Sequence, residues 1–154
     1  MALYYLDTSA LVKLYVREPG TEQVLRLARG AAANQIAVLA LAQVEIHSAL
    51  RRRERAGEIA SAAVVQLLER FHRHLEAVFL RQVITEATFD VACGLVDRHG
   101  LFALDAVQLA GYVALRTASG ANTPIFVSAD RQLLEAAEAE SAPVLDPCSG
   151  FGSV

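Results

Sequence analysis

The chain has 154 residues, of which 54% are apolar and 20% charged, and its formal net charge is −3. A composition this apolar excludes a disordered chain and fits one domain that buries roughly 70% of its unfolded surface. The slightly acidic balance excludes a protein that is basic overall, although a local basic patch can still hold phosphates.

Neither a membrane protein nor a secreted one is expected. No apolar run reaches the roughly 20 residues that a membrane span needs, because Arg, Glu or Gln interrupts every candidate. The N-terminal segment MALYYLD is typical of a strand and not of a signal peptide. Cys93 and Cys148 have the spacing of neither a metal site nor a redox motif, which favours free thiols over a disulfide. We therefore expect a cytoplasmic location.

The beginning of the chain predicts a buried strand followed by two helices. Residues 2–6 (ALYYL) are apolar without alternation, as in a strand of a parallel sheet that is buried on both faces. Thr8 or Ser9 is expected to cap a helix that reaches Val16, where a Pro-Gly pair follows. Thr21 is expected to cap the second helix, which a glycine ends.

Strand and helix patterns alternate through the rest of the chain. In the segment after the second strand we expect Val44, Ala49 and Leu50 to face inward and the arginines outward. The expected elements are a strand at 36–39, helices at 42–56 and 60–79, a strand at 80–84, a helix from its cap Thr85 to Gly100, a helix from Asp105 to about Ala118, a strand at 125–128, a helix at 131–139 and an edge strand at 144–145. This order predicts one α/β domain over residues 1–147, with a mainly parallel sheet and right-handed crossovers, and a tail over residues 148–154.

Four acidic residues fall where a parallel α/β sheet binds its ligands. Asp7 and Asp130 follow predicted strands, Asp105 begins a predicted helix, and Glu45 lies early in the helix after the second strand. Ligands of such sheets bind beyond the carboxyl ends of the strands, so the four side chains are expected to converge. Neighbouring carboxylates raise one another's pKa unless a cation neutralises them, and an oxygen-only set suits Mg²⁺ or Mn²⁺.

Each acid also has a structural interpretation. Asp7, Asp105 and Asp130 stand where an N-cap is favoured, and a helical glutamate such as Glu45 is usually solvated. The conjunction of all four at strand ends or helix starts favours a metal site.

Four segments resemble the four motifs of the PIN-domain family, in particular the VapC-type toxins of prokaryotic toxin–antitoxin pairs. These segments are LDTSALVKLY at residues 6–15, VEI at 44–46, LDAVQLA at 104–110 and FVSADRQLL at 126–134. The resemblance runs in order from residue 3 to about residue 147.

The resemblance implies a three-layer α/β/α sandwich around a parallel sheet in the order 3-2-1-4-5. It also implies RNA cleavage with Mg²⁺ or Mn²⁺, silencing by a cognate antitoxin, and a homodimer. The family's acidic quartet matches Asp7, Glu45, Asp105 and Asp130 position by position. A hydroxyl near the metal is implied for Ser128, and Thr8 or Ser9 are candidates for a further one.

These residues lead to the hypothesis of a metal-dependent endoribonuclease. The acids bind one or two cations, and an activated water attacks an RNA phosphodiester in line, leaving a 3′-hydroxyl and a 5′-phosphate. Because the acids repel RNA, other residues must hold its backbone. The candidates for this role are Arg51, Arg52, Arg53, Arg55, Lys13 and Arg131. The arginine run also has a structural interpretation as a solvated helix face, and an antitoxin contact is a further alternative.

Two other classes of protein are considered. A phosphohydrolase would use Asp7 as a covalent nucleophile, but such enzymes usually carry a second Asp two residues later, where this chain has Ser9. A non-catalytic PIN-like module would bind RNA or a partner without cleaving it. The intact quartet argues against that alternative.

Overall fold

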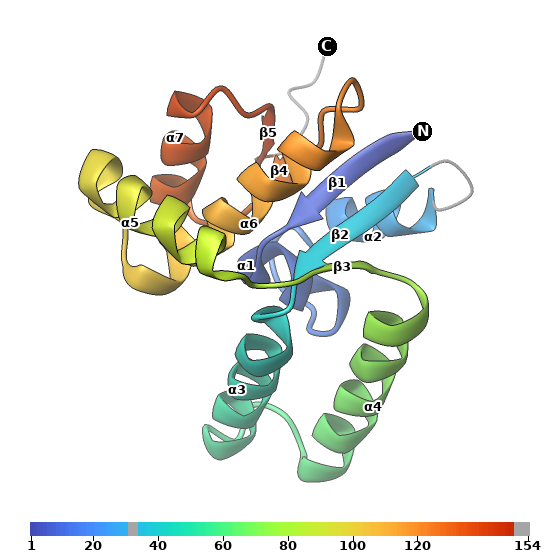
Figure 1. Cartoon of the computed structure of the whole chain (residues 1–154). Helices are drawn as coiled ribbons and strands as arrows, with labels where there is room; N and C mark the ends of the chain where they lie inside the picture. Colours follow the sequence, from blue (N-terminus) through green and yellow to red (C-terminus); the bar gives the residue numbers. More distant parts are fainter. Residues whose placement is uncertain (31–33, 150–154) are drawn as a thin grey trace.

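The computed structural model describes residues 1–30 and 34–149, and within them five strands form a single sheet (Figure 1). All strand pairs are parallel, and the order is β3-β2-β1-β4-β5. The strands are β1 Ala2–Leu6, β2 Asn34–Leu39, β3 Leu80–Gln82, β4 Ile125–Val127 and β5 Val144–Leu145. The helices are α1 Thr8–Leu11, the 3₁₀ turn η1 Val12–Leu14, α2 Thr21–Arg29, α3 Ala42–Arg55, α4 Ser61–Ala77, α5 Glu86–His99, α6 Ala103–Ser119 and α7 Arg131–Ala139. The expected order 3-2-1-4-5 is confirmed.

The sheet separates two apolar cores, which makes the fold a three-layer sandwich. Successive residues of β1 belong to opposite cores, since side chains alternate across a strand: Tyr5 packs with residues of α5, α6 and α7, and Leu6 packs with residues of α1 to α4. Burial on both faces explains why the strands read as apolar runs without alternation. In Figure 1, α3 and α4 form a hairpin that extends beyond the sheet.

Aromatic rings fill the core on the α6 side. Tyr5 stacks on Phe126 with ring centroids 5.7 Å apart, and Tyr112 meets both rings edge-on. Gly111 makes this packing possible, because a Cβ there would lie 2.6 Å from the Tyr5 hydroxyl oxygen and 2.7 Å from a Leu39 methyl carbon. Helix α6 therefore approaches the sheet closely over β1 and β2, which carry Tyr5 and Leu39.

Several helix starts differ from the expectation. The N-cap of α1 is Asp7, whose carboxylate accepts from the Ala10 amide, so neither Thr8 nor Ser9 caps it. The helix becomes a 3₁₀ turn after Leu11, as short helices often do at their ends. Gly20, in the left-handed region, precedes α2 in place of a Thr21 cap. The Thr21 hydroxyl instead bridges the preceding loop by accepting from Glu18 N and donating to Val16 O.

Two further expectations need correction. Helix α6 begins at Ala103 rather than at Asp105, because the Ala106 amide already donates to the Phe102 carbonyl. Val44 is 67% exposed instead of facing inward. The inward face of α3 is formed by Ala42, Ile46, Ala49 and Leu50, whose three- and four-residue spacing leaves Val44 on the opposite side.

The N-cap predicted at Thr85 is confirmed, and Thr88 completes a capping box with it. Both cysteines are free and exposed. Across the described ranges, none of the helices combines the length and the apolar character needed to span a bilayer. Of the predicted tail, residues 150–154 lie outside the part of the chain that the structure describes.

Candidate active site

The sheet topology brings the first and last acids of the quartet to one edge. Strands β1 and β4 are parallel neighbours with Leu6 opposite Val127, and the Asp7 amide donates to the Val127 carbonyl at 3.1 Å. The chain passes from β1 to β2 on one side and reaches β4 on the other, so the strand order reverses at β1. Such a switch point is where open α/β sheets bind ligands. Asp7 and Asp130 both lie just beyond it.

Asp7 is held rigidly by hydrogen bonds to both carboxylate oxygens. Oδ1 accepts from the Ser9 hydroxyl at 2.7 Å and from the Ala10 amide at 3.0 Å, and Oδ2 accepts from the Ser128 hydroxyl at 2.8 Å. The two hydroxyls are fixed in turn, because Ser9 Oγ accepts from Ala129 N and Ser128 Oγ accepts from Asp130 N. The segments after β1 and β4 are thus tied together through this one carboxylate.

Burial dominates the electrostatics of Asp7, which is only 4% exposed. Loss of solvation raises its pKa to about 6, the hydrogen bonds from Ala10, Ser9 and Ser128 oppose that rise, and the nearby Glu45 carboxylate adds to it. In the described part of the chain, no Lys or Arg is ion-paired with Asp7. A buried carboxylate without such a partner is a good position for a metal ligand.

The other three acids come from three different helices. Glu45 lies in the first turn of α3, and its Oε1 accepts from Thr8 Oγ1 at 3.0 Å. Asp105 lies in the first turn of α6, and its pKa is raised by burial, by Asp130 and by Glu45. Asp130 caps α7 by accepting from the Leu133 amide at 3.0 Å. Asp7 and Asp130 are therefore helix caps, as the structural interpretation predicted. A cap uses only some of the lone pairs with which a carboxylate accepts hydrogen bonds, so the others can still face a cation.

All four acids line one pocket of about 340 Å³, together with Thr8, Ser9 and Gln108. Their oxygen-only chemistry suits a hard divalent cation such as Mg²⁺ or Mn²⁺. Within residues 1–30 and 34–149, however, no group of three or more His, Cys, Asp or Glu side chains is close enough to hold a metal ion as it stands. The quartet is thus an open set of ligands around a pocket, as mutual repulsion of carboxylates favours, and not a closed cage.

The six basic candidates fall in three places. Lys13, Arg52 and Arg53 line the acid pocket, whereas Arg51 and Arg55 line a separate hollow between α3 and α4. Arg131 is exposed at the start of α7 and pairs with Glu135 at 3.0 Å. The arginine run is therefore divided between two sides of α3, because consecutive helical residues point in different directions.

Two polar residues of the pocket were not recognised in the sequence. Glu18 accepts from Lys13 Nζ and Arg53 Nη2, both at 2.8 Å, and so forms ion pairs with two basic side chains of the pocket. Gln108 is buried and reaches Glu45 and Thr8. The one sequence signal for Gln108 is a polar side chain within the apolar run of α6, three residues after Asp105 and therefore on the same helix face.

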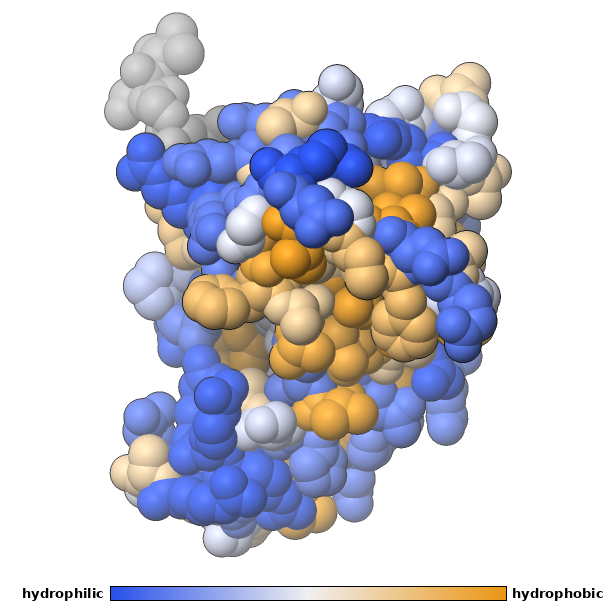
Figure 2. Space-filling model, turned by 60° about the vertical axis from the view of Figure 1, so that its left-hand side comes forward, coloured by the Kyte–Doolittle hydropathy of each residue, from blue (hydrophilic) through white to orange (hydrophobic). Residues whose placement is uncertain are grey.

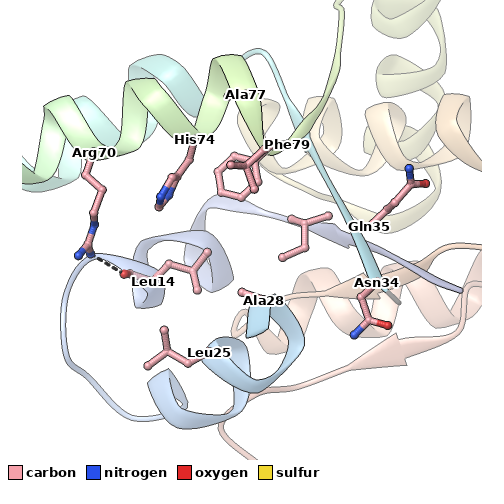
Figure 3. Close-up of a pocket in the computed structure, with 11 residues that line it drawn as sticks. Leu14, Leu25, Ala28, Asn34, Gln35, Arg70, His74, Ala77 and Phe79 are labelled. Carbon is pink, nitrogen blue, oxygen red and sulfur yellow. Dashed lines mark hydrogen bonds between the residues drawn. The ribbon is translucent and has the colours of Figure 1, made fainter. Parts of the chain in front are cut away.

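A larger cavity of about 640 Å³ lies elsewhere, beside the start of β2 and between α2 and α4 (Figure 3). Leu14, Leu25 and Phe79 give it apolar walls, and Arg70 lies at one side with its guanidinium donating to the Leu14 carbonyl. It adjoins the N-terminal end of a strand, whereas the acid pocket lies at the carboxyl ends. The four acids do not line this larger cavity, so the predicted metal site is the smaller pocket.

The fold and the site together define a parallel α/β protein with an acidic pocket at its switch point. Several solved structures share this fold, among them the following three. PAE2754 from Pyrobaculum aerophilum matches with a TM-score of 0.65 at 22% identity, covering 95% of this chain and 84% of that chain. VapBC2 from Rickettsia felis, bound to a DNA fragment from their promoter, gives 0.63 at 13% identity, covering 94% and 98%. FitAcB from Neisseria gonorrhoeae gives 0.58 at 15% identity, covering 96% and 98%.

A comparison with curated proteins gave no match. The model of the PIN domain family matches residues 4–139, which is most of the chain. The chain belongs to the PIN-domain family, whose members are generally nucleases. The family suggested by the four sequence motifs is thereby confirmed.

Proposed function

We propose that this chain is a metal-dependent endoribonuclease and the toxin of a toxin–antitoxin pair. The observation that carries the proposal is the convergence of Asp7, Glu45, Asp105 and Asp130 on one pocket at the switch point of the sheet. Family membership supports the nuclease class. The proposed catalytic unit is one domain over residues 1–147.

The four acids are the proposed ligands of Mg²⁺ or Mn²⁺. A divalent cation bound there would neutralise charge that builds on the scissile phosphate and would promote ionisation of the attacking water. Ser9 and Ser128 contribute by donating to Asp7, which leaves its oxygens in one orientation. Because these donors fix the carboxylate before a substrate arrives, little reorganisation is needed on binding.

The RNA backbone is proposed to be held by basic side chains around the pocket. Arg52 is the foremost candidate because it lines the pocket, is exposed, and takes part in no ion pair among the described residues. Lys13 and Arg53 line the same pocket but are shared with Glu18. Arg51, Arg55 and Arg131 are proposed to contact the RNA backbone further out.

The partner and oligomer proposals rest on the resemblance and on two observations. VapBC2 and FitAcB share the fold, which supports a cognate antitoxin as a partner of this chain. Apolar side chains gather on one face (Figure 2), and large exposed ones occur on α5 and next to its ends. These are Val83, Phe89, Val91, Val96 and Phe102. Exposed apolar patches commonly mark protein–protein contacts, so a homodimer is proposed. The cytoplasmic location stays a prediction.

The decisive experiment measures cleavage of single-stranded RNA by the purified chain in Mg²⁺, with and without EDTA. Asp7→Asn is expected to abolish cleavage, whereas Asp97→Asn, an exposed change on α5, should leave it intact. Equal rates for Asp7→Asn and wild type would contradict the proposal.

A binding measurement tests the RNA contact. Arg52→Gln should weaken RNA binding and reduce its salt dependence. Arg98→Gln, at an arginine that is paired with Glu140, should leave RNA binding unchanged.

Two alternatives remain testable in the same preparations. A phosphohydrolase that uses Asp7 as a nucleophile would be trapped by beryllofluoride, but both Asp7 oxygens are already engaged by hydrogen bonds. A non-catalytic module would bind RNA without cutting it. For the toxin assignment, the gene upstream should encode a short protein with a DNA-binding N-terminus and a disordered tail.

A further inference from the structure

Gln108 connects three of the four motif segments from inside the protein. The residue is 2% exposed and lies on α6. Its Nε2 donates to Glu45 Oε1 at 2.8 Å and to Thr8 Oγ1 at 3.0 Å, and Thr8 Oγ1 donates to the same Glu45 oxygen at 3.0 Å. One oxygen of the glutamate thus receives two hydrogen bonds, from residues 37 and 63 positions away in the chain.

The orientation of the Gln108 amide follows from its surroundings. The hydroxyl of Tyr5, which is fully buried, donates to the backbone carbonyl of Gln108 at 2.8 Å and to its side-chain Oε1 at 3.2 Å. An acceptor at Oε1 on the tyrosine side leaves Nε2, the donor, on the glutamate side. The opposite orientation would direct Oε1 at a carboxylate, which is repulsive. Gly111, one turn along α6, provides the space that lets the Tyr5 hydroxyl reach this position.

Glu45 depends on such support more than Asp7 and Asp130 do. Asp7 and Asp130 are fixed by local backbone amides at their helix starts. Glu45 has a longer side chain with more rotatable bonds, and its partners in the described residues are the Thr8 hydroxyl and the Gln108 amide. Without these two partners, a half-buried glutamate in the first turn of a helix would sample several rotamers.

We propose that Gln108 is a positioning residue of the acid pocket, holding Glu45 in the orientation in which it binds a divalent cation. The inference deepens the proposed function and rests on it. Gln108 itself does not touch the cation or RNA in this proposal. Groups that orient metal ligands in this way typically change metal affinity by about 10- to 100-fold when they are removed.

The test is calorimetric titration of metal-free protein with Mn²⁺ alone. Gln108→Met, which keeps the volume and removes both hydrogen-bond donors, is expected to weaken Mn²⁺ binding by about 10-fold or more. Tyr112→Phe is the matched control, since it removes another buried hydrogen bond of α6, to the Pro124 carbonyl at 3.0 Å, without contact to Glu45. Gln108→Glu provides a second variant of nearly the same shape, and it should also weaken binding because it places two carboxylates together.

A double-mutant cycle separates positioning from a general effect on the fold. If Gln108 acts through Glu45, Gln108→Met should change Mn²⁺ affinity little in a Glu45→Gln background. Equal losses in both backgrounds, or equal losses in Tyr112→Phe, would overturn the inference. Wild-type affinity in folded Gln108→Met, alongside weakened binding in Asp7→Asn, would overturn it while leaving the metal site standing. A wild-type chain that binds no Mn²⁺ would refute the metal site and the inference with it.

Discussion

Replacing Asp7 with asparagine should stabilise the metal-free fold while it abolishes function. The pKa of Asp7 rises from 3.8 to about 6 on folding, chiefly through burial. The native state therefore holds the proton more tightly than the unfolded chain does, and ionisation costs stability as the pH rises above 3.8. The cost stops growing once the pH exceeds about 6, where the native carboxyl ionises too. At pH 7.5 a shift of this size corresponds to about 3 kcal/mol, and at pH 4.5 to about 1 kcal/mol.

The uncharged asparagine avoids this cost but accepts weaker hydrogen bonds from Ser9 and Ala10, a loss of about 1 kcal/mol. Asp7→Asn should thus be more stable than wild type at pH 7.5 by about 1–2 kcal/mol. The difference should fall by about 2 kcal/mol at pH 4.5, where wild-type Asp7 is largely protonated.

Urea unfolding of both proteins in EDTA at the two pH values measures these quantities. Other titrating groups, including Asp105, affect both proteins and cancel to first order in the comparison. A variant less stable than wild type at pH 7.5, or a stability difference that does not change with pH, would refute the reasoning.

Substitutions at three further positions probe the packing and the caps. Leu50→Ala, at a fully buried position of α3, should lower the free energy of unfolding by about 2–5 kcal/mol in urea titrations. Gly111→Ala should cost about 1–3 kcal/mol, because its Cβ would collide with the Tyr5 hydroxyl, and it should also weaken Mn²⁺ binding in calorimetry. Asp130→Ala should lose about 1 kcal/mol of cap stability along with RNA cleavage, whereas Asp130→Asn should lose cleavage and keep most of the stability. An Asn variant as unstable as the Ala variant would contradict a capping role.

Local patterns in the sequence account for much of the fold. Apolar runs without alternation predict strands buried on both faces, and Thr85 as an N-cap marks the start of α5. The strand-end positions of Asp7 and Asp130 were recognisable because β1 and β4 are apolar and end abruptly. The start of α6 was placed two residues late because this helix begins without a side-chain cap after Phe102. Phe102 is not one of the residue types that usually cap a helix, so the sequence does not mark this helix start.

The order of the elements, the parallel character of the sheet and the four acids could all be predicted from the amino-acid pattern. That β1 and β4 are neighbours was implied by the family resemblance and not by any local pattern. The folded chain alone reveals that Arg52 and Arg55 line different hollows and that Gln108 donates to Glu45. The reason is physical. Strand ends and helix faces follow from interactions within a few residues, whereas parallel strands pair only after long crossovers. The hydrogen bond between Gln108 and Glu45 spans 63 positions, so no local pattern of residues can encode it.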